Sequence, residues 1–174
     1  MYDINLITRY IIAYCNGNGY FISNLKLQKL LYFIQIKFLI EKQELCFPDD
    51  IIAVEWGVMI PKVFQKYQSY GSSLIPYSLI FKRNIYPIKE EDKEIIDQVI
   101  SDIGAYSSTI LLKRIIEHKA WKEAYNQESS KVITKEKLEK YLSSYEEQKP
   151  LVKAKIYSLE EYKRKYHKNE DTEI

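Results

Sequence analysis

The chain has 174 residues, of which 46% are hydrophobic, and this suits one domain with a hydrophobic core while leaving too little chain for two. The 26 Lys and Arg residues barely exceed the 24 Asp and Glu residues, so the formal net charge of +2 excludes a protein dominated by a basic field for nucleic acid or membranes. The N-terminus lacks the features of a signal peptide, and no apolar run approaches the roughly 20 residues that span a bilayer. We therefore expect a cytoplasmic protein without membrane contact.

The two cysteines are predicted to be structural. Cys15 and Cys46 each lie in an apolar setting, without a second cysteine or a histidine at the spacing of metal ligands. Because free cysteine is among the most buried residue types, we expect two buried thiols, no metal site and no cofactor.

The N-terminal segment has the apolar periodicity of a helix. It follows Asp3, a good N-cap. We expect it to end near Cys15, because the Asn and Gly residues at 16–19 readily adopt the left-handed backbone conformation that ends a helix. A second helix is predicted to begin at Ser23 or Asn24 and to run to about Lys42.

This second helix is expected to be the central helix of the domain. Its apolar residues occupy two nearly opposite sides, and a helix of this kind is normally buried. Two narrow polar seams remain, Gln28 with Gln35 and Lys26 with Lys37. They can hydrogen-bond neighbouring elements or let the lysine side chains reach water.

Residues 51–60 change to β-branched and aromatic types. The alternation of Ile52, Val54 and Trp56 predicts one short strand, which Gly57 bends. Pro61 then suits the first position of a helix, where its missing N–H costs nothing.

The segment after Pro61 is predicted to form a helix that ends at Tyr70 and Gly71. Residues 72–88 then contain two prolines and two short apolar runs, residues 79–81 and 85–86. These runs are expected either to pair as a hairpin or to pair with the preceding strand.

The rest of the domain is predicted to be helical. Acidic residues 90–92 suit the first turn of a helix that continues to Ile103. Ser107 or Ser108 begins the next helix, a short amphipathic helix surrounds Trp121, and a last helix capped by Thr134 continues to Tyr145.

After Pro150 the composition turns polar, and residues 158–161 form a capping box that predicts an exposed helix to about His167. The expected fold is therefore mainly α. A compact helical domain with a small antiparallel β-sheet spans residues 1–148, and a charged, partly helical tail spans residues 149–174.

The residues for catalysis are missing from this sequence. A hydrolytic site needs a nucleophile with a base, a carboxylate pair or metal ligands, and the only histidines are His118 and His167. His167 lies in the charged tail. His118 precedes Trp121 at helical spacing, so its imidazole can stack on the indole, and a structural histidine is favoured over a catalytic one. The five glycines are scattered singly, so there is no phosphate-binding loop. We expect a protein that is not an enzyme.

The 16 tyrosines and two tryptophans have two interpretations. They form either an aromatic surface for a protein partner or an aromatic core in which tyrosine replaces phenylalanine. A basic cluster in the tail, with members Lys163, Arg164, Lys165 and Lys168, is flanked by acidic residues. That pattern predicts a solvated helix face and argues against nucleic acid as a partner.

Four blocks of sequence together resemble the Panacea domain family, which contains SocA-like antitoxins and phage GepA-type proteins. The first is residues 24–33, Asn-Leu-Lys-Leu-Gln-Lys-Leu-Leu-Tyr-Phe, followed by Gln35. Three further blocks follow in the family's order: residues 53–64 with Tyr67; residues 104–107, Leu111 and residues 118–121; and residues 132–134 with Leu138 and Tyr141.

The second block departs from the family pattern at two positions. Val54 stands where the family usually has Trp, and Val58 stands where it usually has Pro. The turn after Gly57 is therefore expected to be looser, with the aromatic moved to Trp56. The resemblance extends over roughly residues 4–145, and the tail after Pro150 lies outside it.

The resemblance implies a non-enzymatic protein of phages, prophages or mobile elements that binds and neutralises a toxin encoded next to it. SocA itself is described as an adaptor that hands its toxin to a protease, so a host protease is a further expected partner. The alternative is a phage-encoded adaptor or regulator that acts on a host protein or on nucleic acid. Some relatives add a DNA-binding domain, for which we expect no room here.

The resemblance also implies candidate partner-binding residues, which are Trp56, Gly57, Val58, Pro61 and Tyr67, with His118 and Trp121 as a second patch. The alternative is that these residues are fold signatures within the core.

Overall fold

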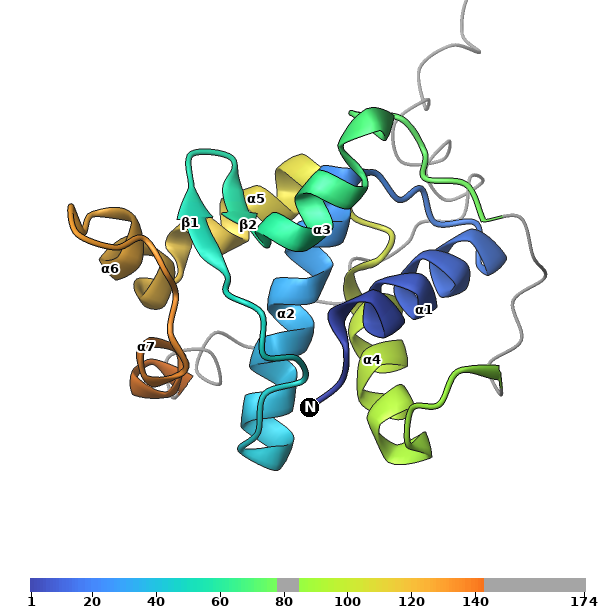
Figure 1. Ribbon diagram of the computed structural model, residues 1–174, viewed down its shortest axis with the longest axis horizontal. Helices are drawn as coiled ribbons and strands as arrows, with labels where there is room; N and C mark the ends of the chain where they lie inside the picture. The colour runs from blue at the N-terminus through green and yellow to red at the C-terminus, as the bar shows by residue number, and fades with distance from the viewer. Residues whose placement is uncertain (78–84, 143–174) are drawn as a thin grey trace, which may run out of the picture.

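The structure is a computed structural model that describes residues 1–77 and 85–142. It is mainly α with a two-stranded antiparallel sheet, as predicted (Figure 1). The elements are α1 (Ile4–Gly17), α2 (Asn24–Lys42), β1 (Ile52–Val54), β2 (Gly57–Met59), α3 (Pro61–Lys66), the 3-10 helix η1 (Gln68–Tyr70), α4 (Glu90–Ile103), α5 (Ser108–Glu117), α6 (Lys119–Tyr125) and α7 (Lys135–Lys140).

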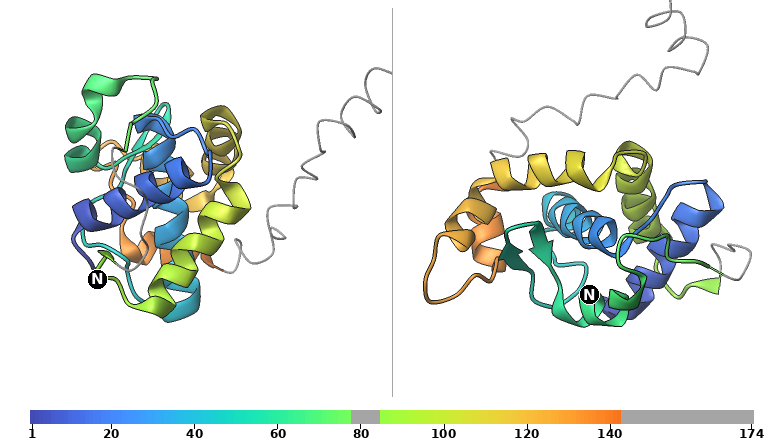
Figure 2. Two further views of the ribbon diagram at one scale, coloured as in Figure 1. Left: turned by 90° about the vertical axis from the view of Figure 1, so that its right-hand side faces the viewer. Right: turned by 90° about the horizontal axis from the view of Figure 1, so that it is seen from above.

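The predicted central helix, α2, lies in the middle of the fold. It packs against α1, α3, α4, α5 and β2. The view along α2 shows α5 on one side and the β1–β2 hairpin on another (Figure 2). The apolar residues on one face are buried, and on the other face Ile36 is buried while Leu25, Phe33 and Ile40 are partly buried.

The two glutamines of α2 fasten the loops on either side of the hairpin. Gln28 accepts a hydrogen bond from the Ile60 N–H at 2.8 Å, and Gln35 accepts one from the Cys46 N–H at 2.9 Å. Gln35 also donates to the Phe47 carbonyl at 2.9 Å. These bonds satisfy buried backbone groups, which would otherwise destabilise the fold.

The predicted single strand at residues 51–60 is wrong, because this segment forms a hairpin. Ala53 pairs with Val58 and Val54 pairs with Gly57, so only Glu55 and Trp56 make the turn. Gly57 has φ +111°, a conformation that reverses the chain where an ordinary bend was predicted.

The outer edge of β1 is covered by the connection between α6 and α7. The Ala53 N–H donates to the Lys131 carbonyl at 2.8 Å, and the Ile133 N–H donates to the Ile51 carbonyl at 2.8 Å. The second predicted hairpin falls partly on residues 78–84, which lie outside the described residues. Shortly before residue 78, the Ile75 N–H donates to the Ile22 carbonyl at 2.9 Å.

The helix starts agree with the predictions at four N-caps, since the side chains of Asp3, Ser23, Ser107 and Thr134 each accept a first-turn N–H. The helix predicted after Pro61 is divided into α3 and η1 by Tyr67.

Both cysteines are buried free thiols, as predicted. The predicted tail, its basic cluster and the domain boundary at residue 148 lie outside the described residues.

Among residues 1–77 and 85–142, no helix has the length and apolarity to cross a membrane. No group of three or more His, Cys, Asp or Glu side chains in the same residues is placed to hold a metal ion.

Candidate partner-binding surface

The hairpin places its predicted site residues in two different environments. Trp56 lies in the turn, with 42% of its side chain exposed, and Pro61 is exposed at the start of α3. Gly57, Val58 and Tyr67 are buried. Of this group, only Trp56 and Pro61 are therefore presented to a partner, and the buried three have the environment of fold signatures.

Trp121 holds the hairpin against α6. Its indole N–H donates to the carbonyl of Gly57, and its ring stacks on Tyr125 with centroids 4.6 Å apart at 12°. Lys131 lies over the Tyr125 ring, with its Nζ 4.5 Å from the centroid. The hairpin whose exposed turn carries Trp56 is therefore held by the packed side chains of Trp121 and Tyr125.

His118, which the sequence favours as a structural histidine, is buried at the junction of α5 and α6. The imidazole packs against Tyr32 and Phe33 of α2, with both centroid distances 5.7 Å, and its Nδ1 lies 3.3 Å from the Tyr32 hydroxyl. His118 ends α5 and begins α6 in an extended conformation, φ −68° and ψ 130°. Burial, with a smaller contribution from Arg114, lowers its pKa to about 3, so the imidazole is neutral at pH 7.

A groove that the sequence interpretation missed lies between the start of α2 and the start of α5. Residues 19–21, 23, 25 and 26 form one wall, and residues 104–108 form the other, with Ser72 at the edge. The groove has a volume of about 640 Å³, and its lining is mainly apolar. Phe21, 54% exposed, was not predicted because a loop aromatic has no periodic pattern to identify it.

Lys26 joins the two walls of this groove. Its ammonium donates to the Phe21 carbonyl at 2.8 Å and to the Gly104 carbonyl at 2.5 Å, and its side chain is only 4% exposed. Burial lowers its pKa. Of the two roles predicted for this lysine, hydrogen bonding to neighbouring elements is the one that the structure shows.

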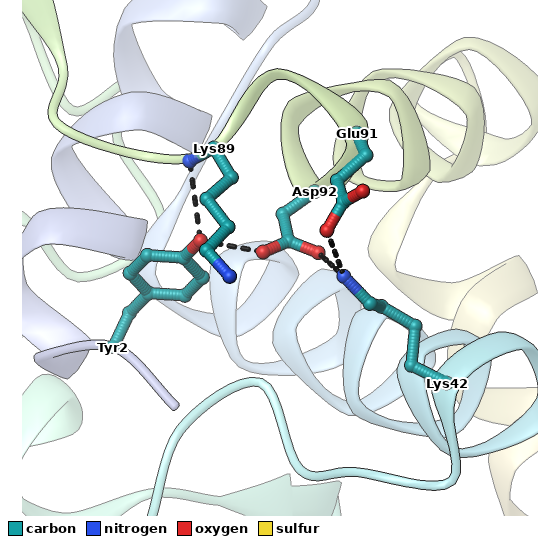
Figure 3. Close-up of polar contacts among 5 residues, drawn as sticks. All are labelled: Tyr2, Lys42, Lys89, Glu91 and Asp92. Carbon is teal, nitrogen blue, oxygen red and sulfur yellow. Dashed lines mark hydrogen bonds and ion pairs between the residues drawn. The ribbon is translucent and has the colours of Figure 1, made fainter.

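A polar network ties the N-terminus to α2 and α4 (Figure 3). Lys42 donates to Asp92 at 2.5 Å and to Glu91 at 2.7 Å, while the Tyr2 hydroxyl donates to Asp92 at 2.5 Å. The Lys89 N–H donates to the Tyr2 oxygen at 3.1 Å. Burial would raise the pKa of Asp92, but the hydrogen bonds from Lys42 and Tyr2 outweigh it and lower this pKa. These polar groups are hydrogen-bond partners of one another, so the role of the network is to stabilise the fold.

Comparison with known proteins identifies the family. A family model described as antitoxin SocA-like, Panacea domain, matches residues 27–122, which is more than half of the chain and extends from α2 to α6. No curated protein and no solved structure matches the chain. The matched range contains the hairpin, Trp121 and one wall of the groove. This chain therefore belongs to the SocA-like antitoxin family defined by the Panacea domain, as the sequence resemblance predicted.

Proposed function

We propose that this protein is an antitoxin that binds and neutralises a toxin encoded next to it on a phage, prophage or other mobile element. The observation that carries the proposal is the match of the SocA-like antitoxin family to residues 27–122. The protein acts by binding, without chemistry of its own.

The exposed hairpin turn supports this binding role. Trp56 is a large aromatic side chain at the tip of a hairpin that Gln28, Trp121 and Lys131 hold in place. A few aromatic anchors on rigid elements dominate most protein interfaces, because little conformational entropy is lost when they bind. In this mechanism Trp56 enters the toxin, and the bound domain blocks or displaces the toxin's active site.

Co-expression tests the proposal. Each gene that flanks this one is induced in a host with and without the chain, and colony survival is counted. We expect one neighbour to kill alone and to be rescued by co-expression. If no neighbour is toxic, or if a toxic neighbour is not rescued, the antitoxin proposal fails.

Trp56→Ala tests the proposed anchor with the same pair. We expect it to weaken toxin binding by more than about 2 kcal/mol while the melting temperature stays nearly unchanged. Tyr70→Ala is the matched control, because Tyr70 is also a partly exposed aromatic, 36%, on a different element. A large fall in melting temperature for Trp56→Ala would instead place this residue in the core.

A further inference from the structure

We infer that the groove between the start of α2 and the start of α5 docks an acidic segment of the partner protein, in which carboxylates alternate with apolar side chains. This inference deepens the proposed function and rests on it for the partner's existence. None of the described residues that line the groove belongs to the β1–β2 hairpin, so the groove provides a second contact area.

The shape and lining of the groove favour a peptide over a small anion. The loop between α1 and α2 and the loop between α4 and α5 lie side by side as its walls (Figure 1). Most of the lining is apolar, and Phe21 leaves 54% of its side chain exposed on one wall. A phosphate or similar ion would leave this apolar surface in water, whereas apolar side chains of a peptide would cover it.

The charge of the groove selects the sign of the peptide. Lys26 is the one formally charged residue among the described residues that line it, and its ammonium has no carboxylate within ion-pair distance in residues 1–77 and 85–142. Its two acceptors are neutral carbonyl oxygens, so the positive charge is not balanced there. A carboxylate in the groove would supply the missing negative charge.

The two helix starts add to the same field. Both α2 and α5 begin at the groove, and the positive ends of their dipoles face it. Ser23 accepts only the Lys26 N–H and Ser107 only the Ile110 N–H among the described contacts. The first-turn N–H groups of Leu25 and Ser108 take no acceptor within the described residues, and both residues line the groove.

A matched pair of charge variants tests the inference. Ser108→Glu places a carboxylate in the groove at the first position of α5, where the helix dipole tolerates it, so the fold is expected to persist. Thr109→Glu adds the same charge to the same helical turn, but Thr109 does not line the groove. Phe21→Ala removes the exposed apolar wall. Circular dichroism and melting temperature verify that all three variants fold.

The probe is a fluorescein-labelled peptide in which Glu and Asp alternate with Leu and Phe, measured by anisotropy against the full chain at about 50 mM salt, where charge effects are weakly screened. Two companion peptides carry Lys or Gln at the acidic positions. We expect the acidic peptide to bind at least roughly tenfold more tightly than either companion. Ser108→Glu and Phe21→Ala should each weaken it roughly tenfold, and Thr109→Glu less than about twofold. Equal binding of the three peptides, or binding unaffected by Ser108→Glu and Phe21→Ala, overturns the inference.

The toxin rescue assay separates this inference from the proposed function. Rescue that is lost with Ser108→Glu but kept with Thr109→Glu supports both. Rescue that survives Ser108→Glu and Phe21→Ala but fails with Trp56→Ala overturns the groove and leaves the antitoxin proposal standing. If no neighbour is toxic while the acidic peptide binds as expected, the groove stands and the antitoxin proposal fails.

Discussion

Lys29 on α2 is a lysine enclosed by the fold. Its side chain is 1% exposed, and its ammonium donates to the Leu25 carbonyl at 3.1 Å. No carboxylate lies within ion-pair distance of it in the described part of the chain. Burial lowers its pKa to about 8, because the charged form loses its hydration. The folded state therefore carries an uncompensated cost at neutral pH.

Replacing Lys29 with Met is expected to stabilise the protein at pH 7 by on the order of 2 kcal/mol, since each pKa unit corresponds to about 1.4 kcal/mol. Below pH 8 the lysine is charged in both states, and the full cost opposes folding. Between pH 8 and its ordinary pKa the unfolded chain binds more protons, so the wild type gains stability as the pH rises and the advantage of the variant shrinks. Urea unfolding at pH 7 and pH 10 measures this.

Lys37→Met is the control for this prediction, because Lys37 lies on the same helix but is partly exposed and pairs with Glu41 at 2.5 Å. We expect a change within about 0.5 kcal/mol there. A Lys29→Met protein that is less stable than the wild type at pH 7 would contradict the account of Lys29 as a buried, costly charge.

His118 is expected to make the fold acid-sensitive. Its pKa is about 3 in the folded protein, below its ordinary value, so the unfolded chain takes up a proton first as the pH falls. Stability is then lost between about pH 6.5 and pH 3, by about 3 kcal/mol at pH 4. His118→Gln keeps a polar side chain near Tyr32 without titrating, so its stability should fall less between pH 7 and pH 4 in urea unfolding. Parallel profiles for the two proteins would refute this role.

At the scale of the element, the hairpin depends on Gly57. Its φ of +111° is a conformation that other residues rarely adopt, and a Cβ there would lie 3.2 Å from Leu112 Cδ1. We expect Gly57→Ala to destabilise the protein by about 2–3 kcal/mol, since backbone strain and crowding add. Chemical denaturation measures the loss.

Gly19→Ala is the matched control for Gly57. Gly19 also has a positive φ, +70°, but a Cβ there meets nothing within 4 Å. Its cost should therefore be the conformational part alone, about 1 kcal/mol. Equal losses at the two sites would show that contact with Leu112 does not matter.

The hairpin also shows what the sequence pattern did not predict at this scale, which is the number of strands. Alternating residues predicted extended structure at the right place, since β-branched side chains suit a pleated surface. The pattern is the same for one strand and for two short strands joined by a tight turn. The choice depends on Gly57 adopting a positive φ, and on Ile51 and Ala53 pairing with residues 131–133, which are far away in the sequence.

At the scale of the whole molecule, the Tyr2, Lys42 and Asp92 network closes the fold at its N-terminal end. Tyr2→Phe and Lys42→Met each remove a donor to the buried Asp92, so each is expected to destabilise the protein. Because both act through one carboxylate, the loss in the double variant should differ from the sum of the two single losses. Since the pKa of Asp92 is lowered, this contribution is present above its ordinary pKa and is lost as the pH falls through the lowered value.

Urea unfolding of the wild type, the two single variants and the double variant measures this coupling. Lys62→Met combined with Tyr2→Phe is the control, because Lys62 pairs with Asp3 at 3.7 Å and has no contact with Asp92. Those two effects should add. Additive effects for Tyr2 and Lys42 would mean that the network does not act as a unit.

Periodicity, caps and composition in the sequence alone determined the helical class, the central position of α2, the N-caps Asp3 and Thr134, two further N-caps to within one residue, and the family. These features are local, because a helix needs only neighbours three and four residues away to define its faces. Contacts between distant segments decided the rest: the burial of Lys26 and Lys29, the place of His118 beside Tyr32, and the groove between two helix starts. A single sequence does not show which loop covers which helix end. Only the tertiary structure therefore separates the exposed Trp56 and Phe21 from aromatic residues that hold the core.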